Sequence, residues 1–129
     1  MQRVLLIGVG GFVGSILRYG LGTTVERWTG GPSPFPAGTV AVNLLGCVVI
    51  GLLAGIVEAR GGISAELRAL LFVGLLGGFT TFSAFGLETV ELLRAGRGGV
   101  AVVNVLVQLV FGFVGVWGGL TMTRALVLK

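Results

Sequence analysis

The sequence contains no histidine and no aspartate, and its only cysteine is Cys47. Without histidine there can be no His-ligated metal site and no Ser-His-Asp triad, and one thiol cannot form an intrachain disulfide. Charge is scarce as well, because Lys, Arg, Asp and Glu make up 11% of the residues, against about 25% in an average soluble domain. These absences exclude the commonest hydrolytic and metal-dependent enzyme classes and the small disulfide scaffolds.

Apolar residues and glycine are abundant instead. The chain of 129 residues is 54% hydrophobic, with a mean hydropathy of +1.04. Glycine accounts for 25 residues without a Gly-X-Y period, which excludes collagen. A soluble fold of this size could not hide so much apolar surface, because small domains bury the smallest fraction of theirs. The composition therefore predicts an integral membrane protein in contact with the lipid bilayer.

The apolar residues fall into four long stretches with few charges. A helix that crosses about 30 Å of hydrocarbon needs roughly 20 residues, and each stretch is long enough. We predict one all-α domain over residues 1–129, with four transmembrane helices at approximately 3–26, 37–57, 65–93 and 98–124.

Local signals mark the helix ends. The prolines Pro32, Pro34 and Pro36 lie together between the first two stretches and predict a loop there. Ser64 is a candidate N-cap for the third helix. The first stretch also has the layout of a signal peptide, but Arg18 stands where a cleavage site would be expected, so we interpret it as a retained helix.

The basic residues are almost evenly divided between the two sides of the membrane. One side would carry Arg3, Arg60, Arg68, Arg124 and Lys129, and the other Arg18, Arg27, Arg94 and Arg97. Cytoplasmic loops normally hold the excess of Lys and Arg. The near balance leaves two possibilities open: a single orientation with both termini inside, or insertion in both directions.

Asn43 is a polar residue in the middle of an apolar helix. A buried amide is costly in hydrocarbon unless it has a hydrogen-bond partner or lines a wet cavity. A hydrogen bond between helices and a position along a pore both satisfy this requirement, and Asn43 alone does not separate them.

The middle of the third predicted helix contains residues that weaken a helix. Gly77 and Gly78 are followed by Thr80, Thr81 and Ser83, and such residues favour other backbone conformations. A break here would free backbone carbonyls that a cation can satisfy. The alternative is a packing notch in which the hydroxyl groups bond back to carbonyls of their own helix.

Phe79, Phe82 and Phe85 follow a three-residue spacing, which places them on one side of a continuous helix. Such a stripe usually serves packing, yet the positive edge of an aromatic ring could also stabilise a small anion. Asn104 and Gln108 form a polar stripe in the fourth helix that could line the same path or bridge helices. All five glutamates are expected near helix ends, which disfavours a proton-coupled cation exporter.

Three segments resemble the signature of the bacterial fluoride channel family, called Fluc or CrcB. They are GGFVGSILRY at 10–19, GTVAVNLLG at 38–46 and GLLGGFTTFSAF at 74–85, in the family's order and one in each of the first three predicted helices. Length and helix number match as well, so the resemblance covers essentially the whole chain.

The resemblance implies a homodimer of two antiparallel, oppositely inserted subunits that enclose two pores, with no enzymatic activity and no nucleic-acid partner. It implies passive, selective fluoride export across the bacterial inner membrane, which relieves fluoride toxicity. It also implies a structural sodium ion at the dimer centre, held by backbone carbonyls of Gly77 and Thr80 from each subunit. The residues that it places along the fluoride pathway are Asn43, Phe82, Ser83 and Phe85, with Arg18 toward the aqueous end.

The chain departs from the family pattern in two places. Ala84 stands where a hydroxyl residue is usual. Asn104 and Gln108 stand on the pathway in the fourth helix where a Tyr/Ser track is common, so the family pattern is not matched at these positions. A small multidrug-type cation antiporter is the alternative among transporters, although it requires a glutamate within the first helix. A membrane assembly subunit without transport activity is the alternative from another class.

Overall fold

The computed structural model describes residues 1–31, 33 and 35–127. Pro32 and Pro34 of the expected loop, and Leu128 and Lys129 at the end of the sequence, lie outside the described residues. Four helical spans are long and apolar enough to cross a membrane, namely Gln2–Trp28, Ala37–Ala59, Ala65–Arg94 and Gly98–Leu126. The prediction of an all-helical protein with four such spans is confirmed.

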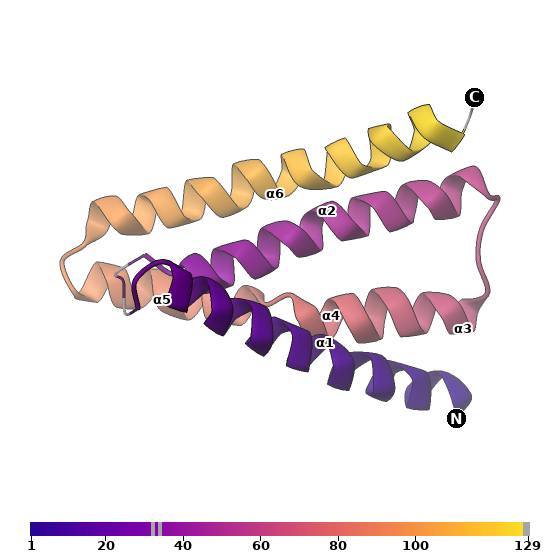
Figure 1. Ribbon diagram of the computed structural model, residues 1–129, viewed down its shortest axis with the longest axis horizontal. Coiled ribbons are helices and arrows are strands. Elements are labelled where there is room, and N and C mark those ends of the chain that lie inside the picture. The colour runs from indigo at the N-terminus through magenta and orange to yellow at the C-terminus, as the bar shows by residue number, and fades with distance from the viewer. Residues whose placement is uncertain (32, 34, 128–129) are drawn as a thin grey trace.

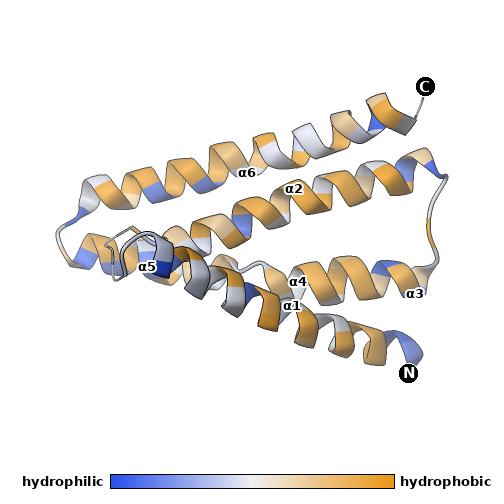
Figure 2. Ribbon diagram, in the orientation of Figure 1, coloured by the Kyte–Doolittle hydropathy of each residue, from blue (hydrophilic) through white to orange (hydrophobic). Residues whose placement is uncertain are grey.

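Helix α1 (Gln2–Trp28) crosses the third span, and α2 (Ala37–Ala59) runs beside α6 (Gly98–Val127), as Figure 1 shows. The four spans run along the bundle one after another in alternating directions, so both termini lie at the same end of the bundle (Figure 1). Hydrophobic residues cover most of each span, and hydrophilic residues gather toward the ends of the bundle (Figure 2).

The helices approach each other so closely that glycine is required at the contacts. A Cβ atom on Gly10 of α1 would lie 2.6 Å from the carbonyl oxygen of Leu70 in the third span. A Cβ atom on Gly119 of α6 would lie 2.6 Å from the amide nitrogen of Leu52 in α2. Small residues are the usual means of close backbone packing in lipid, where no hydrophobic effect drives helices together.

The third span consists of several parts. It begins with α3 (Ala65–Arg68), where Ser64 caps the helix by accepting a hydrogen bond from the Leu67 amide at 3.1 Å, as expected. It continues through a wide π-helical segment, η1 (Ala69–Leu76), and the short α4 (Gly77–Phe79) to α5 (Phe82–Arg94).

Thr80 and Thr81 separate α4 from α5 and have extended backbone conformations. Their φ and ψ angles are −87° and 159° for Thr80, and −150° and 112° for Thr81. The Thr81 hydroxyl then accepts a hydrogen bond from the Ala84 amide at 3.2 Å and so caps α5. This pair of residues lies beside the middle of α2, where the candidate site is found.

Candidate functional site

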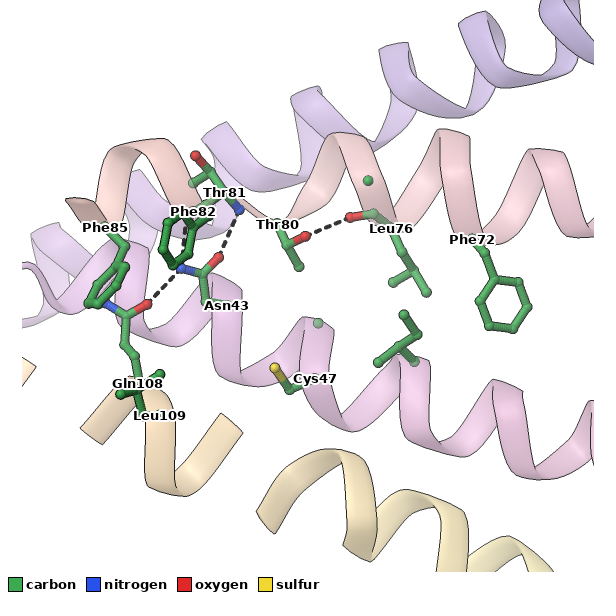
Figure 3. A pocket seen from close by; sticks show the side chains of 13 residues that line it. Asn43, Cys47, Phe72, Leu76, Thr80, Thr81, Phe82, Phe85, Gln108 and Leu109 are labelled. Carbon is green, nitrogen blue, oxygen red and sulfur yellow. Dashed lines mark hydrogen bonds between the residues drawn. The ribbon is translucent and has the colours of Figure 1, made fainter. Parts of the chain in front are cut away.

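A pocket of about 370 Å³ lies where Thr80 and Thr81 pass α2 (Figure 3). Side chains from three spans line it, including an amide from α2, two phenylalanines from α5 and an amide from α6. The residues from the predicted site that line it are Asn43, Gly77, Thr80, Phe82, Phe85 and Gln108. The structure therefore gathers most of the predicted site residues around a single pocket.

The two phenylalanine rings of this pocket lie against each other at an angle. The ring centroids of Phe82 and Phe85 are 5.4 Å apart and the ring planes are inclined by 56°. Phe85 is buried, whereas Phe82 is 79% exposed on the single chain. Inclined rings present hydrogen-bearing, electropositive edges as well as faces to the space beside them.

Phe79 does not belong to this pair, and the three phenylalanines were expected on one side only of a helix that continues through all of them. Phe79 is buried and lines a separate apolar pocket with Leu17, Leu21 and Leu45. The three-residue spacing holds only in a continuous helix, and the extended Thr80 and Thr81 lie between Phe79 and Phe82. The stripe is thereby divided.

The side-chain amide of Asn43 bonds to both the backbone amide and the backbone carbonyl of Thr81. Its Oδ1 accepts from the Thr81 amide at 2.8 Å, and its Nδ2 donates to the Thr81 carbonyl at 3.1 Å and to Gln108 Oε1 at 2.7 Å (Figure 3). The amide is thus satisfied by contacts between spans, which is one of the two explanations for its presence. Its contact with an ion stays a prediction.

The carbonyls of Gly77 and Thr80 have lost their usual α-helical partners. The Thr81 amide, which would bond to Gly77, donates to Asn43, and the Ala84 amide, which would bond to Thr80, donates to the Thr81 hydroxyl. Among the described residues there is no cluster of three or more His, Cys, Asp or Glu. The contact of these two carbonyls with a sodium ion stays a prediction.

Arg18 lies in a second pocket of about 430 Å³, on the side of α1. This pocket also contains Tyr19, Thr39 and Thr81, and Arg18 is half-buried in it. Thr81 lines both pockets, so the two spaces meet at the extended segment. Arg18 therefore lies in a different pocket from Phe82 and Phe85.

The remaining predicted residues differ in their access to the first pocket. Ser83 is exposed, with its hydroxyl 3.2 Å from that of Thr81. Gln108 lines the pocket, but Asn104 is fully buried with 0% exposure and bonds to Thr89 and Gln108 inside the bundle. Of the two polar residues in the stripe of α6, only Gln108 therefore lines the pocket.

Glu88 lies within the bundle, although we expected it near a helix end. Six residues separate it from the end of α5 at Arg94, about 9 Å along a helix. The Thr39 hydroxyl donates to Glu88 Oε1 at 2.6 Å, and Glu88 Oε2 is buried without a partner among the described residues. No sequence pattern pairs Thr39 with Glu88, because the contact depends on how α5 returns beside α2.

Known proteins resemble this chain over nearly its whole length. Residues 5–120 match the family model described as "CrcB-like protein, Camphor Resistance (CrcB)". A protein of Methylobacillus flagellatus named "Fluoride-specific ion channel FluC" is 46% identical over 96% of each chain. Proteins with the same name are 43% identical in Rhizobium etli, over 98% of this chain and 100% of the relative, and 39% identical in Pseudomonas syringae pv. tomato, over 96% and 98%.

Proposed function

This chain belongs to the CrcB family, and on that premise we propose that it is a fluoride-selective ion channel of the bacterial cell membrane. Passive export through it lowers cytoplasmic fluoride and gives resistance to the ion. Neutral HF crosses lipid and dissociates inside the cell, so the trapped anion needs a route out. The observation that carries the proposal is 46% identity over 96% of the chain to a relative named as a fluoride channel.

A fluoride ion must exchange its water shell for hydrogen-bond donors and positive ring edges along the path. The residues that we propose for this task are Phe82 and Phe85, with Ser83, Asn43 and Gln108 near them. Neutral groups suit a channel, because an ion must be bound strongly enough to enter but weakly enough to leave. Arg18, in the neighbouring pocket, would raise the local concentration of anions near the aqueous end.

We further propose that two copies of the chain pair in antiparallel orientation. Two observations support this: the near balance of basic residues between the two sides, and the large exposure of Phe82 in a pocket that one chain leaves open. A second copy on this face would cover Phe82 and complete the walls of the pathway. It would also bring a second pair of Gly77 and Thr80 carbonyls toward the first, in reach of one central sodium ion.

Glu88 is the observation that favours the alternative, a proton-coupled antiporter. Ionisable groups inside membrane spans often take part in proton relays, and one Glu88 oxygen is buried without a partner among the described residues. A channel and an antiporter differ in what drives them, so a flux measurement separates the two.

The test is fluoride efflux from liposomes that contain the purified protein, followed with a fluoride electrode. A potassium gradient with a potassium ionophore supplies the electrical driving force, and protein-free liposomes are the control. We expect efflux that begins when the ionophore is added and needs no pH gradient. Fluoride efflux that requires a pH gradient would indicate proton-coupled transport, and absence of efflux would indicate an assembly subunit or a transporter of cations.

A further inference from the structure

Five hydrogen bonds form a continuous chain that leaves the third span at Thr81 and returns to it at Phe85. The Thr81 amide donates to Asn43 at 2.8 Å, Asn43 to Gln108 at 2.7 Å, Gln108 to Asn104 at 2.9 Å, Asn104 to Thr89 at 2.9 Å, and Thr89 to the Phe85 carbonyl at 2.7 Å. We call this chain the amide relay.

Every bond of the amide relay runs in the same direction. Each of its three side-chain amides accepts with its oxygen and donates with its nitrogen. Hydrogen bonds in such a series polarise one another and strengthen in a low-dielectric interior. We therefore expect the loss of one member to weaken the remaining bonds of the relay.

Asn104 is placed to hold the relay together rather than to meet an ion. It is 0% exposed, its oxygen accepts from Gln108, and its nitrogen donates to Thr89. A buried amide that loses such partners pays the cost of an unsatisfied polar group. Its position in the bundle is therefore strongly determined.

The start of α5 needs such an anchor. The extended Thr80 and Thr81 precede it, so the position of α5 is not fixed by a continuous helix with α4. The first two turns of α5 carry both Phe82 and Phe85. The relay attaches these turns to α2 through Asn43 and to α6 through Asn104 and Gln108.

We propose that Thr89, Asn104 and Gln108 are positioning residues that fix the two phenylalanines relative to α2 and α6. For Asn104 this role takes the place of direct contact with the ion. The inference rests on the proposed fluoride conduction only for its functional readout. Displacements of about 1 Å in groups that contact a reacting species change enzyme rates by about 100-fold, and an ion pathway has similar geometric demands.

Thr89 offers a clean test because α6 contains a matched control. Thr89 and Thr121 each donate to the carbonyl four residues earlier, but only Thr89 also accepts from Asn104. The variants are Thr89→Val, which keeps the shape and removes the hydroxyl, Thr89→Ser, which restores the hydroxyl, and Thr121→Val. Each is purified as the full chain and compared in fluoride efflux, in fluoride-over-chloride selectivity, and in hydrogen exchange of the Thr81 amide by NMR.

We expect Thr89→Val to reduce fluoride efflux by about tenfold or more and to lower the selectivity. The Thr81 amide, at the far end of the relay, should exchange at least about threefold faster because its local structure opens more often. Thr89→Ser and Thr121→Val should resemble the unmodified chain in all three measurements.

Two outcomes would overturn the proposal. In one, Thr89→Val matches Thr121→Val in efflux, selectivity and Thr81 exchange. In the other, Thr89→Ser is impaired as much as Thr89→Val, which would assign the effect to side-chain volume. If the unmodified chain moves no fluoride, the proposed function fails, and the Thr81 exchange rates still decide whether the relay exists.

Discussion

Phe82 and Phe85 line the same pocket but are covered by the single chain to different degrees. Phe85 is buried, and Phe82 is 79% exposed. Phe113 of α6 is similarly exposed, at 74%, but does not line the pocket. Phe113 is therefore a suitable control for a substitution of Phe82, because it shares the exposure of Phe82 but does not line the pocket.

Replacement of Phe82 with alanine should reduce fluoride efflux by a factor of about 2 to 13. An aromatic edge contact contributes about 0.5–1.5 kcal/mol, and about 1.4 kcal/mol corresponds to a factor of ten in rate. The measurement is electrode-detected efflux from liposomes, with dimer content checked by size-exclusion chromatography. Phe113→Ala should behave like the unmodified chain, and normal efflux in Phe82→Ala would remove the ring from the pathway.

Among the helices, the conformation of the third span depends on contacts with residues that lie far away in the sequence. The four spans follow from composition, because charges and prolines mark their ends. The glycine pair and the hydroxyl residues indicated a weak point near residue 80. Of the two extended residues there, Thr81 is held by Asn43, which lies 38 positions away, and no single-sequence pattern predicts that pairing.

The separation of Phe79 from Phe82 and Phe85 also results from the extended conformation of Thr80 and Thr81. Phe79 and Phe82 share a side only if the helix continues between them, so one local change of conformation separates the residues of the expected stripe. The wide turns of Ala69–Leu76 were also not expected. They lie where Gly10 and Gly74 bring α1 against the third span, and such contacts between distant segments are decided in three dimensions.

Gly10→Ala should destabilise the protein by about 1–3 kcal/mol, because the added methyl group would overlap the backbone of Leu70 and Leu75. Gly8, in the same helix, is the control, since nothing lies within 4 Å of a Cβ atom at that position. Gly8→Ala should be neutral or slightly stabilising, because alanine favours helix more than glycine does. Thermal unfolding in detergent compares the two, and equal losses would mean that the close contact is not the cause.

For the whole molecule, the proposed assembly around a cation is supported by the open face at the pocket and by the carbonyls of Gly77 and Thr80, which lack their α-helical donors. The chain provides backbone oxygens there, and the described residues provide no carboxylate cluster. An ion that binds only the assembled form stabilises it by about 2.7 kcal/mol when its concentration is 100 times its dissociation constant.

Exhaustive replacement of sodium by a large organic cation should therefore lower the midpoint of dimer unfolding by several degrees. Readdition of sodium should restore the midpoint, whereas the same concentration of the organic cation should not. Subunit mixing between differently labelled preparations provides a second readout. A midpoint that is independent of sodium after full exchange would argue against a structural cation.

Selective, passive conduction of fluoride by this chain can be tested through the reversal potential in a planar bilayer. Fluoride is placed on one side and chloride on the other, with the pH equal on both sides. We expect a current whose reversal potential lies far toward the fluoride equilibrium potential and does not move when a pH gradient is added. A reversal potential set by chloride or by protons would contradict this expectation.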